Sequence, residues 1–411
     1  MKLAKWIKRF DSESSEPWPG DCASIEALTA FNKNTNNYIK QIPPYPGYKF
    51  KRGIVYCAGG QKYFTNAWVS VNILRKLGCK LPIQFWTLEN EITPTMRELL
   101  KPLNVEVIDG TKIDYKPRLL YGWELKALAL CYNSFKEVIF LDADNVPIRN
   151  PEYLFDTKEF KKTGAIFWPD YGRLEEFRGA WKLAGLSYRD EPEFESGQIF
   201  VDRERVWKPL SLALWYNEHS DFVYQHVHGD KETFHLAFRK LKRAYSMPSY
   251  PIYTLPGVMC QHDFEGNRIF QHRNMNKWVL LGENKRIPDF IHEEECINFI
   301  EDLKKKWKGE IDFDRKKRPS FSMESTLINS TWEYERVGYD KRKLVLGSNN
   351  LIQVGEARME KIWRVYNEDK ILLGIFGEDG LPTCYLERVN SKLWKGNWLR
   401  FEKMPIILRG L

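Results

Sequence analysis

The segment "VIFLDADNVPIRNP", residues 138–151, places two aspartates directly after four strongly apolar residues. The apolar run 138–141 has the composition of a buried β-strand. Asp142 and Asp144 lie two positions apart, so in an extended segment both side chains point the same way and can converge on one point. Two hard carboxylate oxygens in one pocket favour a divalent cation, Mn²⁺ or Mg²⁺, which usually also holds a substrate phosphate. The plainer alternative is a turn after a strand.

The chain on either side of this segment predicts an α/β fold. Strand-like runs at 53–57, 81–88 and 105–109 alternate with helical patterns at 63–78, near 93–101 and at 121–133. Such alternation is typical of a sheet with parallel strands, and ligands bind such sheets beyond the carboxyl ends of the strands. Asp142 and Asp144 follow one of those ends.

Changes in composition divide the chain into four parts. Residues 1–50 are polar and proline-rich, and we expect an irregular N-terminal arm. The α/β domain then covers residues 51–300, and the charged stretch 301–325 is interpreted as a linker. Residues 326–411 consist of short strand-like runs between Gly, Asn and Asp turns, which predict a small antiparallel β domain, a sandwich or a barrel.

The composition excludes several classes of protein. The net charge of +8 is spread along 411 residues, without the aromatic-basic pattern or the zinc-finger spacing of a dedicated nucleic-acid binder. It suits anionic small molecules or an acidic membrane surface better. Most of the 15 tryptophans are expected in cores, and some could form sugar-stacking surfaces. Seven cysteines without any CxxC pair predict free thiols in a reducing compartment.

The N-terminus gives no strong targeting signal. No apolar run reaches the roughly 20 residues that span a bilayer. The start, "MKLAKWIKRF", lacks the apolar core of a signal peptide and allows at most peripheral membrane contact. The expected location is therefore the cytoplasm.

Five segments, taken in order, resemble GT-A glycosyltransferases, in particular the fungal-type α-mannosyltransferase family and more distantly the glycogenin-like retaining transferases. They are "YGWELKALALCYNSF" (121–135), "FKEVIFLDADNVPIRNPEYLF" (135–155), "ESGQIFVDRERVW" (195–207), "HGDKETFHLAF" (228–238) and "IFQHRNMNKW" (269–278). The resemblance covers about residues 53–280. It implies a GT-A catalytic domain over residues 51–300 that transfers a hexose from a nucleoside-diphosphate sugar to a glycan hydroxyl, with retention.

For the donor, the resemblance implies a nucleotide site after the first strand. Gly59 and Gly60 form a turn that lets backbone approach a nucleotide, although a plain tight turn has the same sequence. The resemblance places the base and ribose against Tyr56, Cys57, Ala58 and Gly59. It also brings Lys126 to the donor's phosphate or sugar, whereas a lone lysine in an apolar helix could instead extend to solvent.

For the metal, the resemblance makes His272 the third ligand beside Asp142 and Asp144. Neutral imidazole is a good Mn²⁺ ligand, and the ammonium of Lys277 would offset charge on the departing diphosphate. Asn274 completes the donor-binding part of this motif. His262 is a rival ligand that the motif favours less, and the histidines at 226, 228 and 235 lack a metal-binding pattern.

Two further segments supply polar groups that suit a sugar. Glu195, Ser196, Gly197 and Gln198 mix hydrogen-bond donors with acceptors, and the resemblance places them under the donor sugar. The alternative is a loop before the strand 199–202. Asp230 lies at a predicted helix start, where an ordinary cap is the alternative to a contact with sugar hydroxyls. Glu195, Asp230 and Lys277 are the candidate catalytic residues.

The donor and the mechanism stay open at this stage. Similarity favours GDP-mannose, while UDP-hexoses use the same architecture. Front-face attack and a covalent intermediate both fit retention. The fungal relatives carry a membrane anchor, and its absence here points to a bacterial or virus-encoded enzyme. A sugar-phosphate nucleotidyltransferase and a non-catalytic glycan-binding protein on a transferase fold are the alternatives.

Overall fold

The computed structural model describes most of the chain outside its N-terminus. The described residues are 25–88, 91–115, 123–176, 179–224, 226–227, 229–309, 326–347, 351–357, 360–367, 372–376, 382–398 and 404–411. The basic start of the chain, His228, Cys22 and most of the predicted linker lie outside these ranges. No helix among the described residues is long and apolar enough to cross a membrane. The six described cysteines are free thiols.

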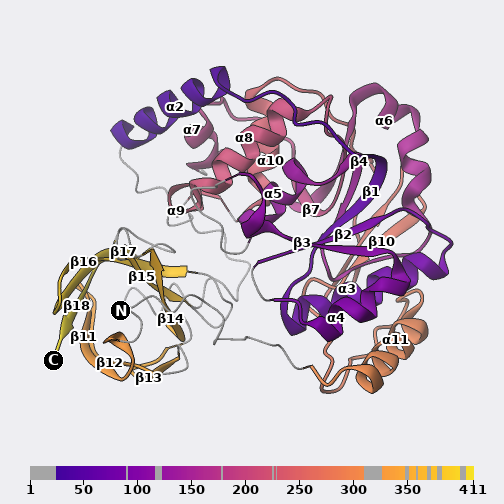
Figure 1. Cartoon of the computed structure of the whole chain (residues 1–411). Coiled ribbons are helices and arrows are strands. Elements are labelled where there is room, and N and C mark those ends of the chain that lie inside the picture. The colour runs from indigo at the N-terminus through magenta and orange to yellow at the C-terminus, as the bar shows by residue number, and fades with distance from the viewer. Residues whose placement is uncertain are drawn as a thin grey trace.

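A six-stranded mixed sheet forms the centre of the first domain (Figure 1). Its strands, in spatial order, are β3 (Val105–Asp109), β2 (Ile83–Thr87), β1 (Phe50–Cys57), β4 (Phe135–Leu141), β7 (Pro192–Asp202) and β6 (Ala165–Arg173). Strands β3, β2, β1 and β4 pair in parallel, and β7 runs antiparallel to both β4 and β6. The carboxyl ends of β1 and β4 therefore meet at one edge, and Asp142 follows there, as the sequence predicts.

Helices cover both faces of this sheet (Figure 1). Alternate residues of β1 and β4 face opposite sides: Val55 and Val138 join one hydrophobic core, whereas Ile54 and Ile139 join the other. The helices that contribute to the first core include α5 (Glu124–Tyr132), α7 (Gly179–Ala184), α8 (Trp207–Glu218) and α10 (Lys231–Lys240). Those that contribute to the second are α3 (Gly60–Lys76), α4 (Pro94–Leu100), α6 (Lys158–Thr163) and α11 (Glu293–Lys306).

A small antiparallel sheet brings a distant segment to the carboxyl end of β4. Its order is β5 (Asn145–Pro147), β10 (Arg268–His272), β9 (Val258–His262) and β8 (Tyr253–Leu255). The register pairs His272 with Asn145, so the histidine is fixed beside the two aspartates. The remaining short elements are α9 (Ser220–Val223) and the 3-10 helices at Lys101–Leu103, Gly110–Lys112 and Pro151–Asp156.

The predicted irregular arm contains a helix, α2 (Ile25–Lys40), so that part of the prediction is wrong. One face of this helix is apolar, and Phe31 packs against Trp215 and Phe222 with ring centroids 5.0 and 4.9 Å apart. Burial of this face against α8 stabilises the helix. Its asparagine and lysine residues make the helix hard to recognise in the sequence.

The predicted linker also begins too early, because residues 301–306 form the end of α11 and Trp307 is buried. The Trp307 ring packs edge-on against Phe64 of α3, with centroids 5.1 Å apart. The basic residues Lys304, Lys305 and Lys306 lie in the last helical turn, where cations interact favourably with the helix dipole. The charge run is thus partly the last turn of a packed helix.

The C-terminal region is an eight-stranded antiparallel sheet, which confirms the predicted small β domain. Its order is β13 (Ile352–Val354), β12 (Asp340–Leu346), β11 (Ser330–Arg336), β18 (Pro405–Gly410), β17 (Leu393–Trp398), β16 (Pro382–Asn390), β15 (Leu372–Phe376) and β14 (Ile362–Asn367). The sheet curls (Figure 1), and the amide of Ile352 donates to the carbonyl of Lys361 across its two outer strands, 2.9 Å away. Trp332, Trp363, Trp394 and Trp398 are buried in its core, as expected.

Candidate active site

The segment after β4 forms a turn, and this turn carries the two aspartates of a carboxylate cluster. The amide of Asn145 donates to the carbonyl of Asp142 at 3.0 Å, which closes the turn. The amide of Asp142 donates to the carbonyl of Gly197 at 2.9 Å and so attaches the turn to β7. The side chain of Asn145 donates to the same carbonyl and to Gln198 Oε1, at 2.8 and 2.7 Å. Both aspartates are thereby held by backbone that has little freedom to move.

His272 lies among three carboxylates. Its Nε2 is 3.3 Å from Asp144 Oδ1 and 3.9 Å from Asp142 Oδ2, and its Nδ1 is 3.2 Å from Glu195 Oε1. Asp142, Glu195 and His272 each offer a ligand atom within 4.8 Å of the other two. Carboxylate oxygens with one imidazole are ligands that suit Mn²⁺, so the residues present fit such a cation. Glu195 is thus an additional candidate metal ligand, although the sequence analysis placed it under the donor sugar.

Charge and burial shape the protonation of this cluster. Burial raises the pKa of Asp142 despite the opposing effects of Lys126 and His272. Burial would also raise the pKa of Glu195, but His272 outweighs it and lowers the value to about 2. Burial would lower the pKa of His272, yet Asp144 and Glu195 raise it to about 10. Without a metal ion the imidazole therefore carries a proton at neutral pH, and a metal ion that binds His272 must displace this proton.

Lys126 points into the site rather than out to solvent. It is buried on α5, with Nζ 3.0 Å from Asp142 Oδ1 and 2.9 Å from Asp230 Oδ2. It also donates to Ser196 Oγ at 2.9 Å. Asp230 occupies the N-cap position of α10, but its side chain makes no capping hydrogen bond and pairs with Lys126 instead. The ordinary cap and the solvent-directed lysine are therefore wrong, and the contacts of both residues with a donor stay predictions.

Lys277 reaches the cluster, whereas the contacts described for Asn274 lie within its own turn. The ammonium of Lys277 forms an ion pair with Asp144. Burial would raise the pKa of Asp144, but His272 and Lys277 together hold it well below its usual range. The side-chain oxygen of Asn274 accepts a hydrogen bond from the amide of Met275, 3.0 Å away, within its own turn.

Glu195 to Gln198 belong to strand β7 rather than to the loop that the sequence also allowed. Gln198 pairs with Leu141, and Glu195 pairs with Trp168 of β6 across an irregularity in the ladder. A Cβ on Gly197 would lie 2.5 Å from His272 Nδ1 and 2.7 Å from Glu195 Oε1. Only a glycine leaves room here for the imidazole and the carboxylate.

The residues at the end of β1 differ in what they can present to a nucleotide, and their role in binding the donor stays a prediction. The Tyr56 side chain lies in the core, where its hydroxyl is 2.8 Å from Ser70 Oγ, so only its backbone is available to a ligand. Cys57 lies near the cluster, and burial raises the pKa of its thiol despite Lys126. Ala58 is buried, and Gly59 contacts Glu91 so closely that a Cβ would lie 2.0 Å from Glu91 Oε2.

Sequence reasoning gave no role to Lys231, although it lies within the segment "HGDKETF". The ammonium of this partly buried lysine contacts Asp170 at 2.5 Å and also forms an ion pair with Glu193. Its position directly after Asp230 was the available signal. Among the described contacts, none brings His262 to the carboxylate cluster. Its carbonyl accepts a hydrogen bond from the indole N–H of Trp168, 2.7 Å away. His235 is buried, and its Nε2 lies 2.8 Å from Glu191 Oε1.

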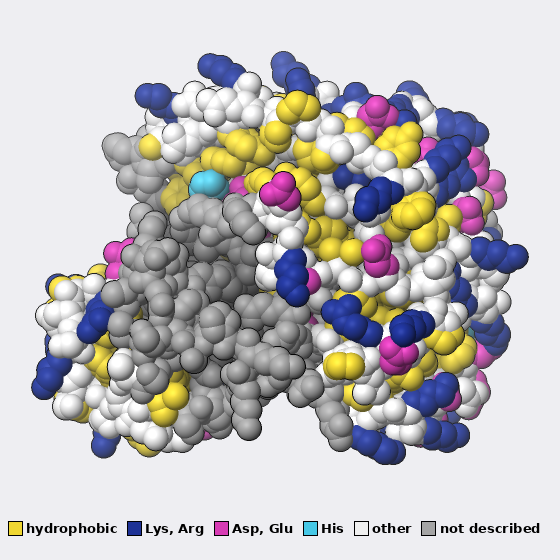
Figure 2. Space-filling view, viewed as in Figure 1, with side chains coloured by type: hydrophobic (Ala, Val, Ile, Leu, Met, Phe, Trp, Pro, Cys, Tyr) yellow, Lys and Arg dark blue, Asp and Glu magenta, His cyan; other side chains and the backbone are white. Residues whose placement is uncertain are grey.

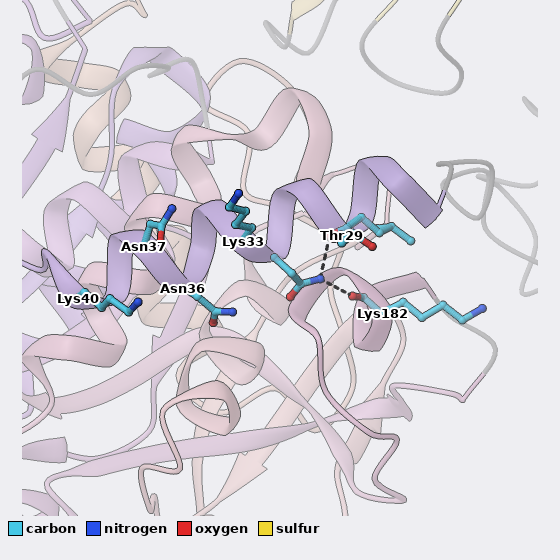
Figure 3. Close-up of a pocket in the computed structure, with 8 residues that line it drawn as sticks. Thr29, Lys33, Asn36, Asn37, Lys40 and Lys182 are labelled. Atoms are coloured by element: carbon cyan, nitrogen blue, oxygen red, sulfur yellow. Dashed lines mark hydrogen bonds between the residues drawn. The ribbon is translucent and has the colours of Figure 1, made fainter.

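A groove of about 690 Å³ lies elsewhere, on α2 and α7 (Figure 3). Asn32 spans it by donating to the carbonyls of Leu28 and Lys182, at 3.0 and 2.9 Å. None of its lining residues belongs to the carboxylate cluster. In Figure 2 Lys and Arg side chains are scattered over the visible face rather than gathered in one basic patch.

Comparisons with known proteins find a matching family model and curated relatives. The family model described as "Mannosyltransferase putative" matches residues 51–193 and 187–272. Alpha-1,2-mannosyltransferase MNN21 of Candida albicans is 29% identical over 316 residues, which cover 59% of this chain and 46% of that protein. Alpha-1,2-mannosyltransferase MNN2 of Saccharomyces cerevisiae is 24% identical over 306 residues, which cover 61% of this chain and 50% of that protein.

The likeness to solved structures is looser. Galactosyltransferase LgtC, solved with donor and acceptor sugar analogues, is 15% identical with a TM-score of 0.34, and the match covers 48% of this chain and 73% of that one. The chain spans about half the length, or less, of the curated relatives named above.

Proposed function

The chain belongs to the mannosyltransferase family, and we propose that it transfers mannose from a nucleoside-diphosphate sugar to a glycan hydroxyl with the help of Mn²⁺ or Mg²⁺. GDP-mannose is the proposed donor, and we propose retention of the anomeric configuration. The single observation that supports this most is the convergence of Asp142, Asp144, Glu195 and His272 at the carboxyl end of β4. This is the edge of a parallel sheet at which ligands bind.

Asp142, Glu195 and His272, with Asp144 beside them, are the residues proposed to hold the cation. When bound, the cation would offset the negative charge of the donor's diphosphate. Lys277 would stabilise the additional charge that develops on the departing nucleotide, because its ammonium lies at the same cluster. Displacement of the His272 proton would accompany cation binding, since the imidazole must be neutral to act as a ligand.

Lys126, Asp230 and Ser196 form the adjoining part of the site and are proposed to hold the transferred sugar. Lys126 contacts both Asp142 and Asp230, so it connects the cation side of the site to the sugar side. A carboxylate and a hydroxyl at hydrogen-bond distance from one ammonium offer the mixed acceptors and donors that sugar hydroxyls require. Asp230 and Glu195 are the carboxylates proposed to orient the sugar or accept the proton of the attacking hydroxyl.

The test is donor cleavage by the purified chain in the presence of Mn²⁺, with a panel of GDP- and UDP-sugars. We expect nucleotide release from one donor, abolished by EDTA. The doubly substituted Asp142→Asn, Asp144→Asn protein should lose at least about a hundredfold in rate, because it lacks the anionic ligands.

Asp109→Asn is the matched control, because Asp109 ends β3 at the same edge of the sheet. Its side chain accepts a hydrogen bond from the amide of Thr111 and so caps the 3-10 helix Gly110–Lys112, a role that asparagine also fills. Equal rates in the wild type and the double variant would reject the proposal. Metal-independent binding of glycans without any donor cleavage would favour the glycan-binding alternative. Pyrophosphate release from a nucleoside triphosphate and a sugar phosphate would favour the nucleotidyltransferase.

A further inference from the structure

Trp123 differs from the other tryptophans of the described chain. Every other described tryptophan is buried, whereas Trp123 is 43% exposed. Single exposed aromatic residues are ordinary on protein surfaces, so exposure alone identifies no site. The position of Trp123 next to Lys126 and Asp230 is the second observation that points to a ligand.

Trp123 directly precedes α5 and lies three residues before Lys126, which is about one helical turn. Its ring rests on Gly229, where a Cβ would lie 2.9 Å from the indole. Gly229 has a φ of +98°, so a larger residue there would be strained as well as crowded. Gly229 immediately precedes Asp230, the partner of Lys126. The indole is therefore seated on the segment that carries a candidate catalytic carboxylate.

The order of groups outward from the metal cluster suggests which ligand meets this ring. His272 contacts Asp142, Asp142 contacts Lys126, Lys126 contacts Asp230, and Trp123 lies beyond. A donor anchored by its diphosphate at the cluster would place its sugar near Lys126 and Asp230. The next surface outward, still open to solvent, suits the substrate that arrives second. An indole offers that substrate a flat apolar face with a polar edge, as a hexose ring requires.

We propose that Trp123 is a stacking platform for the acceptor hexose and thereby determines acceptor affinity. This inference rests on the proposed function. The Tyr224 ring supports the platform from the side, with centroids 6.1 Å apart and planes at 49°.

The experiment compares wild type, Trp123→Ala and Trp123→Phe, with GDP-mannose as donor and methyl α-pyranosides of mannose, glucose and galactose as acceptors. We expect Trp123→Ala to raise the acceptor KM about tenfold, the scale of one aromatic contact. Donor hydrolysis without acceptor and the donor KM should stay within about twofold of wild type, since the diphosphate site is untouched. Trp123→Phe should recover most of the affinity. Tyr48→Ala is the control, because Tyr48 is 51% exposed and precedes β1 at the opposite edge of the sheet.

The outcomes separate the two proposals. A wild type that never cleaves a nucleotide sugar removes the proposed function, and this inference with it. An active wild type whose acceptor KM is unchanged in Trp123→Ala, or which transfers to none of the three glycosides, overturns the inference alone. A rise in the donor KM instead would assign the ring to the donor, and equal losses in hydrolysis and transfer would make it structural; both results reject the acceptor platform.

Discussion

At Gly197 the backbone of β7 passes so close to His272 that a single methyl group would collide with the imidazole. We expect Gly197→Ala to weaken Mn²⁺ binding at least about tenfold and to lower the free energy of unfolding by about 1–3 kcal/mol, the usual cost of overpacking. Titration calorimetry and urea unfolding would measure the two effects. Gly172→Ala is the control, since a Cβ there meets Glu193 at 3.9 Å, an ordinary contact. Wild-type metal affinity in Gly197→Ala would contradict this account of the site.

Individual residues of the site could be predicted where a motif carries them. Asp142, Asp144, His272 and Lys277 do converge, and Lys126 and Asp230 do meet. The role of Glu195 as a potential ligand could not be foreseen, because it depends on which residue of β7 lies opposite His272. That register includes an irregularity in the β6–β7 ladder that no sequence pattern reports. The inward direction of the Tyr56 side chain was not predicted either; it follows from the alternation along β1, and a contact between its backbone and the nucleotide stays a prediction.

At the scale of elements, strands and packed helices with strong apolar patterns were predictable, and elements defined by tertiary contacts were not. The predicted strands at 53–57 and 138–141 lie within β1 and β4. Helix α2 was missed because asparagines and lysines interrupt its apolar residues, and its buried face is recognised only from the packing of Phe31, Tyr38 and neighbouring residues against the core. The end of α11 was taken for a linker because its charges lie in the last turn beside the buried Leu303 and Trp307.

A buried histidine in the connection between α9 and α10 is expected to make the stability of the fold depend on pH. Its buried His226 has no hydrogen-bond partner for either ring nitrogen among the described residues, and burial lowers its pKa to about 4. The unfolded chain gains a proton at this histidine below about pH 6.5, and the folded protein does so only near pH 4. The contribution of His226 to the free energy of unfolding is therefore fully present above pH 6.5 and is lost as the pH is lowered toward 4.

His226→Phe should remove this dependence while keeping an aromatic ring beside Phe222, whose centroid is 5.1 Å away. The difference in unfolding free energy between variant and wild type should shift in favour of the variant by up to about 3 kcal/mol between pH 7 and pH 4. Urea unfolding at several pH values would measure it. A difference that does not change with pH would show that His226 titrates normally.

At the scale of the whole molecule, the β domain has a core of its own. The buried cluster of β11–β18 shares no residue with the cores on either face of the central sheet. Its strands pair only with one another in the described chain. The carboxylate cluster belongs entirely to the first domain. Cation binding and the packing of the β domain should therefore act on different cooperative units.

Calorimetry of the full chain should accordingly show two unfolding transitions. Mn²⁺ at a hundred times its dissociation constant should stabilise only the α/β unit, by about 2.7 kcal/mol, because a ligand stabilises the unit that binds it. Trp394→Ala should destabilise only the β unit, by about 3–5 kcal/mol, and Trp168→Ala only the α/β unit, since both rings are fully buried in different cores. A single transition that both Mn²⁺ and Trp394→Ala displace would instead mean that the two domains fold as one unit, and the β domain would then brace the catalytic sheet directly.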